Sequence, residues 1–390
     1  MANLDWHAEI TDLSDLALLD RSPESEGIDL KAVRLYRLNR MRSQTVKYGF
    51  DAVIISDPVH IRYVTGTRNM QVFIARNTPT RSIMFECAGC LHLVKGYETI
   101  DQVRTAKSVT FTNKEKKGAE EMADLVRDIV GKRDMTLGLG CMNANVAIAL
   151  KELGLNIVDA QQAIEMSRTI TSPKKIKCIV ASLRATEVAV GKLREAVSPG
   201  LTENELWSVM HKSVIEQNGN HVETRLLSAG PQLTPWFQGS ANYVIQKNKL
   251  VALDTDVVGC HGYYSDFSPT FHSGPNPPTE DQKELYRTAH EQVHHNMSIL
   301  KPGLTFREYA DQARDIPKHL MGEYPYLYYR GDFPDAGYDG VIEPGMVLCV
   351  ESYIGEEGGS QGVKLEQQVL ITETGTEVLS EFPFEKAMLK

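Results

Sequence analysis

The sequence lacks any apolar run long enough to cross a membrane. Of its 390 residues, 24% are charged and 42% hydrophobic, and no stretch approaches the roughly 18 consecutive apolar residues that a transmembrane helix needs. Residues 1–27 are acidic and lack the basic start and apolar core of a secretory signal. We therefore expect a cytoplasmic globular protein with no membrane partner, long enough for two domains.

Positive charge is in short supply as well. The chain has 42 Lys and Arg residues against 51 Asp and Glu residues, which gives a formal net charge of -9 at pH 7. Binding to phosphate groups needs an excess of cations, so this balance argues against general affinity for nucleic acids or anionic membranes. A small-molecule substrate or a peptide is the better expectation for a ligand.

Cysteines are few and scattered. No dense framework of closely spaced cysteines is present, so we expect reduced thiols. Cys87 and Cys90 have the CxxC spacing, but no second pair and no CxxH follows that would complete a zinc site. Structural or incidental thiols are therefore predicted at all six positions, Cys87, Cys90, Cys141, Cys178, Cys260 and Cys349.

Residues 1–168 alternate helical and strand-like patterns, which predicts an α/β domain. Residues 30–49 place apolar and basic positions at helical spacing, and Phe50–Ser56 has the pattern of a buried strand that the turn pair Asp57-Pro58 ends. A second helix is expected near 116–130. Further strands are expected at 81–87, 91–96, 108–113 and 135–140.

Residues 169–390 form the second expected domain. Pro173 suits the first turn of a helix, with Ser172 as its N-cap, and Pro199-Gly200 would end that helix. The domain boundary is therefore expected near residues 165–170.

This second domain contains an internal echo. Ser198–Leu206 recurs in similar form as Lys301–Tyr309, and each copy combines a helix end, a Pro-Gly turn and a helix start with Thr as its cap. Strand-like runs follow each copy. We therefore predict two related α/β halves that face each other.

Acidic residues interrupt the apolar strands of both halves. Asp254 and Asp256 are two positions apart and are expected on one face of a buried strand, and a hairpin would return Asp266 beside them. Glu351 and Glu366 each lie in an apolar strand of the second half. Carboxylates buried together need compensating positive charge. The pattern predicts one or two divalent ions such as Fe, Mn, Co or Zn. The alternative is that Arg, Lys or backbone groups satisfy each acid, but basic residues are scarce in these strands.

At these residues the sequence resembles the creatinase and methionine aminopeptidase superfamily. The resemblance covers nearly the whole chain, including the segment 168–173, the Gly-Tyr-x-Ser-Asp motif that ends at Asp266, the segment 343–347 and the two Glu strands. It implies a creatinase-like α/β domain over 1–168, followed over 169–390 by an α+β pita-bread domain with an internal pseudo-twofold repeat. Asp, Asp, His, Glu and Glu side chains bind one or two metal ions in that fold.

Within this superfamily, Asp254-x-Asp256 followed by Asp266 resembles the DddP-type dimethylsulfoniopropionate lyases. In that group all three acids help to bind iron or a similar metal pair. The segments 69–73, 224–231, 235–238 and 333–340 also resemble the group. The resemblance implies cleavage of dimethylsulfoniopropionate to dimethyl sulfide and acrylate by a homodimer, with iron as the favoured ion and Mn, Zn or Co as alternatives.

Several aromatic residues are candidates for holding the positive sulfonium group of such a substrate. Cation–π attraction contributes about 0.5 to 2 kcal/mol per contact. The alternative role for each ring is packing in the core. The candidates are Trp236, Phe237, Tyr263 and Tyr264.

One motif of the lyase group is missing. The group carries a His-Gly-x-Gly-x-x-Asp-Glu segment with the metal-binding His and the base, whereas no His-Gly-x-Gly precedes Glu343 here. In one alignment His319 is the metal ligand and Glu323 substitutes for the base. In the other, both functions are deleted and His319 is a surface residue at a helix end.

Three functions follow from these patterns. The leading interpretation is a metal-dependent carbon–sulfur lyase. The second is a hydrolase of Xaa-Pro peptides or of a creatine-like amide, in which a metal-bound hydroxide attacks a carbonyl. The third is a non-catalytic protein that retains the pita-bread fold without the His-Gly motif.

Overall fold

The protein is described here by a computed structural model. It covers residues 27–67, 71–75, 81–106, 114–132, 134–314, 333–356 and 358–390, together with Pro23, Leu327 and Arg330. The chain divides into two compact units, one formed by Asp29–Ser172 and the other by Pro173–Lys390 together with the described residues before Asp29. Within the described residues, no helix has the length and apolar character needed to span a membrane.

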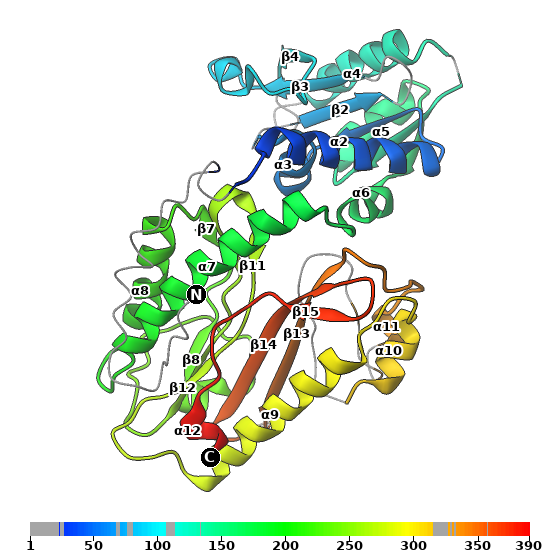
Figure 1. Cartoon of the computed structure of the whole chain (residues 1–390). Helices are drawn as coiled ribbons and strands as arrows, with labels where there is room; N and C mark the ends of the chain where they lie inside the picture. The colour runs from blue at the N-terminus through cyan, green and yellow to red at the C-terminus, as the bar shows by residue number, and fades with distance from the viewer. Residues whose placement is uncertain are drawn as a thin grey trace. The chain divides into compact units, whose positions relative to one another are not determined.

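The described part of the first unit is a mixed six-stranded sheet in the order β4-β3-β2-β1-β5-β6 (Figure 1). Its strands are β1 (Ala52–Ile55), β2 (Gln71–Ala75), β3 (Ser82–Glu86), β4 (Gln102–Thr105), β5 (Thr136–Gly140) and β6 (Asn156–Asp159). Its helices are α2 (Leu30–Lys47), α3 (Pro58–Thr65), α4 (Glu115–Val130), α5 (Ala144–Glu152) and α6 (Gln161–Arg168), with the short 3-10 helix η1 (Leu91–Val94).

Helices cover both faces of this sheet, and β1 shows why. Ala52 and Ile54 belong to the core that α4 and α5 complete, whereas Val53 and Ile55 belong to the core under α2, α3 and α6. Successive side chains of a strand point to opposite faces, so a strand covered on both sides is apolar at every position. The predicted α/β domain is confirmed, and α2, α4, β1, β3 and β5 lie where the sequence placed them, whereas β2, β4, β6, α3, α5 and α6 were not predicted.

Three local predictions for this unit fare differently. The run 91–96 is not a strand, because Leu93 N–H bonds to Cys90 O and Lys95 N–H to His92 O, which close 3-10 turns instead. The pair Asp57-Pro58 is a helix start, with the Asp57 carboxylate accepting from the N–H groups of Val59 and His60. The strand expected at 108–113 lies outside the described residues.

The second unit contains two similar halves. The first half holds α7 (Pro173–Ala196), α8 (Glu203–Glu216), β7 (His221–Val222), β8 (Leu227–Ala229), η2 (Gly230–Leu233), β9 (Leu250–Leu253), β10 (Val257–Val258), η3 (Cys260–Gly262), β11 (Tyr264–Ser265) and β12 (Thr270–His272). The second half holds α9 (Glu280–Ile299), α10 (Phe306–Gln312), α11 (Phe333–Ala336), β13 (Val347–Gly355), β14 (Gly362–Ile371), β15 (Thr376–Val378) and α12 (Lys386–Leu389). Figure 1 shows α9 running along β13 and β14.

The predicted repeat is present in detail. Thr202 begins α8 with a capping box that includes Glu205, and Thr305 begins α10 in the same way with Glu308. A backbone bridge joins Thr202 to Val244 in the first half and Thr305 to Val341 in the second. Because the same local hydrogen bonds recur in the same order, the two halves share this helix–turn–helix segment, while the strands that follow form two three-stranded sheets in the first half and one in the second.

Candidate metal centre

The five acids singled out in the sequence lie together in the second unit. Their carboxylate oxygens fall into overlapping groups whose members lie within 4.8 Å of one another. One group joins Asp254, Asp256 and Asp266, and another joins Asp254, Glu351 and Glu366. The two halves of the fold therefore contribute acids to a single buried cluster.

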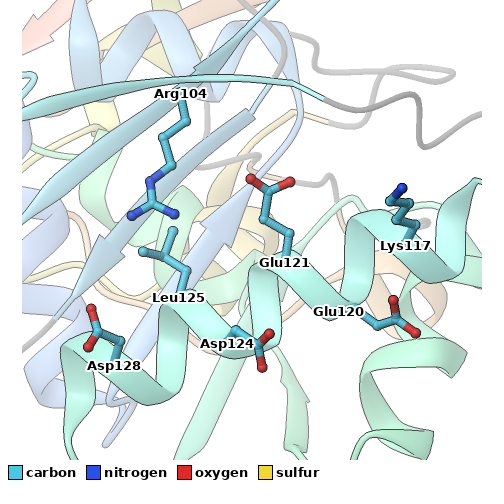
Figure 2. A pocket seen from close by; sticks show the side chains of 7 residues that line it. All are labelled: Arg104, Lys117, Glu120, Glu121, Asp124, Leu125 and Asp128. Atoms are coloured by element: carbon cyan, nitrogen blue, oxygen red, sulfur yellow. The ribbon is translucent and has the colours of Figure 1, made fainter.

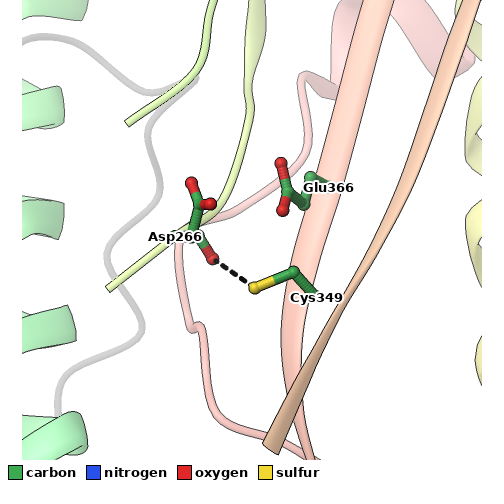
Figure 3. Close-up of side chains that lie close together, drawn as sticks. All are labelled: Asp266, Cys349 and Glu366. Carbon is green, nitrogen blue, oxygen red and sulfur yellow. Dashed lines mark hydrogen bonds between the residues drawn. The ribbon is translucent and has the colours of Figure 1, made fainter. Parts of the chain in front are cut away.

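Strand pairing explains most of this convergence. Glu351 of β13 lies directly opposite Glu366 of β14 in the antiparallel register. The β10–β11 hairpin pairs Val257 with Ser265, which brings Asp256 beside Asp266, so that Asp256 N–H donates to Asp266 Oδ1 at 3.2 Å. Figure 3 shows the Asp266 and Glu366 carboxylates approaching each other from the two halves.

The approach of Asp254 to Asp256 has a different cause from the one predicted. The strand β9 ends at Leu253, and Asp256 adopts a left-handed backbone with φ of 38°. Between them the chain leaves the sheet of β8, β9 and β12 and enters the sheet of β7, β10 and β11. The two acids meet because the chain changes sheets at Thr255, not because they share one face of a continuous strand.

A lysine that the sequence analysis passed over sits inside the cluster. Lys364 Nζ lies 2.8 Å from Glu366 Oε2 and 3.5 Å from Asp254 Oδ2, and it also contacts Glu351 Oε2. Its side chain is 1% exposed. Lys364 precedes Glu366 by two positions in β14, so the alternation that places Glu366 in the cluster places Lys364 there as well.

Ser268 links the acids of the two halves. Its Oγ lies 2.7 Å from both Asp254 Oδ1 and Glu366 Oε2, and Lys364 Nζ donates to it at 3.1 Å. The second oxygen of Glu366, Oε1, is buried and has no hydrogen-bond partner among the described residues. A buried carboxylate oxygen without a partner is costly, and a bound cation would satisfy it.

The electrostatics of the cluster show that one ammonium does not balance it. Burial, reinforced by the neighbouring carboxylates, raises the pKa of Asp266 and of Glu366 well above the usual values. Burial beside Asp254 raises the pKa of Asp256 to about 6. Burial also opposes ionisation of Asp254, but the Lys364 ammonium and the hydrogen bonds to the carboxylate hold the pKa of Asp254 below its usual value. Oxygen donors with unbalanced negative charge fit a divalent ion.

A buried thiol borders the cluster. Cys349 Sγ lies within 4.8 Å of carboxylate oxygens of Asp266 and Glu366, and its S–H donates to the Asp266 carbonyl at 4.0 Å (Figure 3). Burial and the surrounding carboxylates raise the pKa of the Cys349 thiol well above its usual value. Because the thiolate is the form that binds metal, Cys349 is a weaker donor here than the acids.

An aromatic pair continues the strand face that carries the acids. Tyr353 follows Glu351 by two positions in β13 and pairs with Lys364 across the strands. The Trp236 ring stacks on Tyr353 with centroids 6.0 Å apart. Phe237 lies next to Trp236 and is 37% exposed. Tyr353 was not singled out in the sequence, although its spacing from Glu351 was a usable signal.

The two predicted tyrosines have other contacts. The Tyr263 ring lies under Lys175 Nζ of α7, and its carbonyl accepts from Ser182 of the same helix. Tyr264 donates its hydroxyl proton to Glu223, an exposed residue. Packing against α7 and a surface hydrogen bond account for these two rings. His319 and Glu323 lie outside the described residues.

A cavity of about 490 Å³ lies elsewhere, in the unit formed by Asp29–Ser172 (Figure 2). Arg104 extends from β4 toward Leu125 of α4, and the other lining residues are Lys117, Glu120, Glu121, Asp124 and Asp128. None of the five clustered acids lines it. We therefore place the chemistry in the buried carboxylate cluster and not in this surface cavity.

The sequence profile of metallopeptidase family M24 matches residues 177–373, and the profile of the creatinase/prolidase N-terminal domain matches residues 37–170. The chain belongs to metallopeptidase family M24. The M24 match contains every acid of the cluster. The predicted superfamily and the predicted two-part architecture are therefore confirmed.

Two curated relatives of this M24 protein share its full-length organisation. The dimethylsulfoniopropionate lyase DddP of Roseovarius nubinhibens is 32% identical over 93% of this chain and 88% of its own length. The dimethylsulfoniopropionate lyase DddP of Roseobacter denitrificans is 31% identical over 100% of this chain and 91% of its own length. The resemblance to DddP-type proteins is thus confirmed along the chain.

Solved structures share the fold of this M24 protein at lower identity. The Xaa-Pro dipeptidase from Bacillus anthracis superposes with a TM-score of 0.76 at 22% identity, covering 90% of this chain and 99% of that one. The prolidase from Pyrococcus furiosus superposes with a TM-score of 0.70 at 21% identity, covering 87% and 99%. At this identity the likeness establishes the pita-bread fold.

The position of Asp266 in the cluster leads to a prediction about the metal content of this M24 protein. Replacing Asp266 by Ala removes the carboxylate that faces acids from both halves, so we expect metal retained after gel filtration to fall to background. Elemental analysis of the purified variant measures this. Asp281→Ala, at an exposed acid in the first turn of α9, is the matched control and keeps the wild-type content. Unchanged metal in Asp266→Ala would contradict the assignment.

Proposed function

We propose that this protein is a metal-dependent lyase that cleaves dimethylsulfoniopropionate to dimethyl sulfide and acrylate. The observation that carries the proposal is the similarity to two relatives named for this activity, at 32% and 31% identity over nearly the whole chain. The buried cluster supports the proposal, because Asp254, which belongs to the acidic pattern that resembles the lyase group, lies together with the other four acids of the predicted metal site. The substrate is a small molecule with a carboxylate and a sulfonium group.

The proposed ligands are Asp254, Asp256, Asp266, Glu351 and Glu366, with His319 as a further candidate. A divalent ion held there supplies Lewis acidity toward the substrate carboxylate. Iron is the ion that we expect, and Mn, Zn and Co accept the same donors. Strand pairing within each half positions these carboxylates: Glu351 and Glu366 lie on the paired strands β13 and β14, and Asp256 and Asp266 flank the paired strands β10 and β11.

The proposed reaction is an elimination. A base removes a proton from the carbon next to the carboxylate, the electron pair of that bond forms the carbon–carbon double bond, and the bond to sulfur breaks. Dimethyl sulfide leaves as a neutral molecule, and acrylate keeps the carboxylate charge. We assign the base to Glu323 from the alignment in which Glu323 takes the place of the base in the motif, because a carboxylate can serve as a general base.

The aromatic pair is suited to the positive end of the substrate. Tyr353 lies on the strand face of Glu351 and opposite Lys364, and the Trp236 ring stacks on Tyr353. Trp236 is 8% exposed, and its Nε1 is buried with no hydrogen-bond partner among the described residues. A ligand that binds there would gain a cation–π contact with the rings and satisfy this N–H.

The activity itself is the direct test. Metal-loaded protein incubated with dimethylsulfoniopropionate is expected to release dimethyl sulfide and acrylate in equal amounts, measured by headspace gas chromatography and liquid chromatography. Treatment with a chelator should abolish both products, and restoring the metal should recover them. A blank trace beside a working lyase would discard the proposal. Turnover of Xaa-Pro dipeptides in its place would assign a hydrolase, and failure to retain metal would indicate a non-catalytic protein.

The base and the histidine are tested as a pair. We expect Glu323→Gln to lower kcat by roughly 100- to 10,000-fold with its metal content unchanged, which is the usual contribution of a general base. We expect His319→Ala to lower the metal content. If both variants behave as wild type, the alignment in which the motif is deleted is correct and the base lies elsewhere.

Trp236→Leu tests the aromatic contact. Loss of a contact that contributes about 1 to 2 kcal/mol raises KM by roughly 5- to 30-fold with a smaller change in kcat. Initial rates of dimethyl sulfide release measure both constants. Trp207→Leu is the control, because Trp207 contacts His211 within α8 and should leave KM unchanged. Equal KM values for Trp236→Leu and wild type would remove Trp236 from the substrate site.

A further inference from the structure

One of the groupings of acids already holds a cation. The grouping of Asp254, Glu351 and Glu366 has one carboxylate oxygen from each residue within 4.8 Å of the others. Lys364 Nζ contacts all three of these residues. An ammonium group is thus bound by the same three carboxylates that a metal ion would need at that place.

Lys364 is also held where it is. Its backbone N–H donates to Thr270 Oγ1 at 3.0 Å, and its carbonyl accepts from the same hydroxyl at 2.7 Å. The side chain is 1% exposed, so an ammonium displaced by a metal ion would remain buried. A buried charge without partners is strongly unfavourable. The ion that entered would also face a like charge at contact distance.

The ion pairs of Lys364 with Asp254, Glu351 and Glu366 do not extend to Asp256 and Asp266. The grouping of Asp254, Asp256 and Asp266 shares only Asp254 with the contacts of Lys364. Glu366 presents Oε2 to the ammonium, while its Oε1 has no hydrogen-bond partner among the described residues. The donors that still lack positive charge therefore lie on the side of Asp256 and Asp266.

We propose that Lys364 is a fixed internal cation that takes the place of one metal ion, so that the centre binds a single divalent ion around Asp266, whose carboxylate is grouped with Asp254 and Asp256 on one side and with Glu366 on the other. This inference rests on the proposed metal-dependent function and narrows it. Lys364 acts as a positioning residue: it holds Glu351 and Glu366 in place and restricts the cluster to one ion.

The test is the metal stoichiometry of the full-length protein. Mn(II) is added to the chelator-treated protein, excess metal is removed by gel filtration, and bound metal is counted by elemental analysis. Electron paramagnetic resonance then distinguishes an isolated Mn(II) ion from a magnetically coupled pair. We expect about one ion per chain and the spectrum of an isolated ion.

The variants isolate the charge of the lysine. Lys364→Met keeps the length of the side chain without its charge, and we expect the bound metal to rise toward two ions per chain with a coupled spectrum. Lys364→Arg keeps the charge and should retain one ion. Lys212→Met, at a lysine whose side chain is 79% exposed, is the control and should match wild type.

The outcomes separate this inference from the proposed function. Two tightly bound ions in the wild-type protein, together with dimethyl sulfide release, would overturn the single-ion centre and leave the lyase in place. No bound metal at any concentration would overturn both. If Lys364→Met does not fold, the wild-type count and spectrum still decide between one ion and two.

Discussion

The constraint on which this structure depends is the clustering of five carboxylates, four of them almost fully buried, with one ammonium that contacts three of them. Asp254, Asp266, Glu351 and Glu366 are almost fully buried, and Glu351 and Glu366 face each other across paired strands. Like charges directly opposite in a sheet are destabilising, and charges removed from water need compensation. Lys364 compensates only part of this charge, as the raised pKa values of Asp256, Asp266 and Glu366 show. A bound cation would offset the electrostatic cost of burying these carboxylates together, which gives a physical reason for the fold to retain the cluster.

The two halves of the pita-bread unit meet at that cluster. Asp254 and Glu351 stand at matching places, each four residues after the first residue of its strand, β9 or β13. Ser268 and Glu366 exchange backbone hydrogen bonds of 3.4 and 3.1 Å between the halves, and the Ser268 hydroxyl joins their acids. Neither half completes the site alone. In the proposed metal site, binding is therefore coupled to the docking of the two halves, because the proposed acidic ligands come together only when both halves are folded.

Much of this arrangement was predictable because it depends on local rules. The Pro-Gly turns and the Thr caps predicted the starts of α8 and α10, and the apolar runs predicted the strands that carry Glu351 and Glu366. The errors arose where tertiary structure overrides local pattern. The run 91–96 is as apolar as a strand but closes 3-10 turns, and Asp254 and Asp256 meet through a change of sheet that a left-handed Asp256 permits. Lys364 could have been placed in the cluster from its spacing of two residues to Glu366. The scarcity of basic residues in these strands pointed away from a lysine there.

A centre with one ion and one fixed ammonium also bears on the kind of reaction proposed. A hydrolase of this fold needs a metal-bound hydroxide to attack a carbonyl, whereas elimination needs positive charge on the substrate carboxylate and a base near the adjacent carbon. One Lewis acid meets the first need, and the leaving group departs neutral, so no second ion is required to stabilise it. The buried lysine is then compatible with a carbon–sulfur lyase and unfavourable for chemistry that relies on a metal pair. Glu351, Lys364 and Tyr353 lie on one strand face, and Trp236 stacks on Tyr353. This arrangement matches the proposed zwitterionic substrate, whose negative end would meet the metal ion and whose positive end would meet the rings.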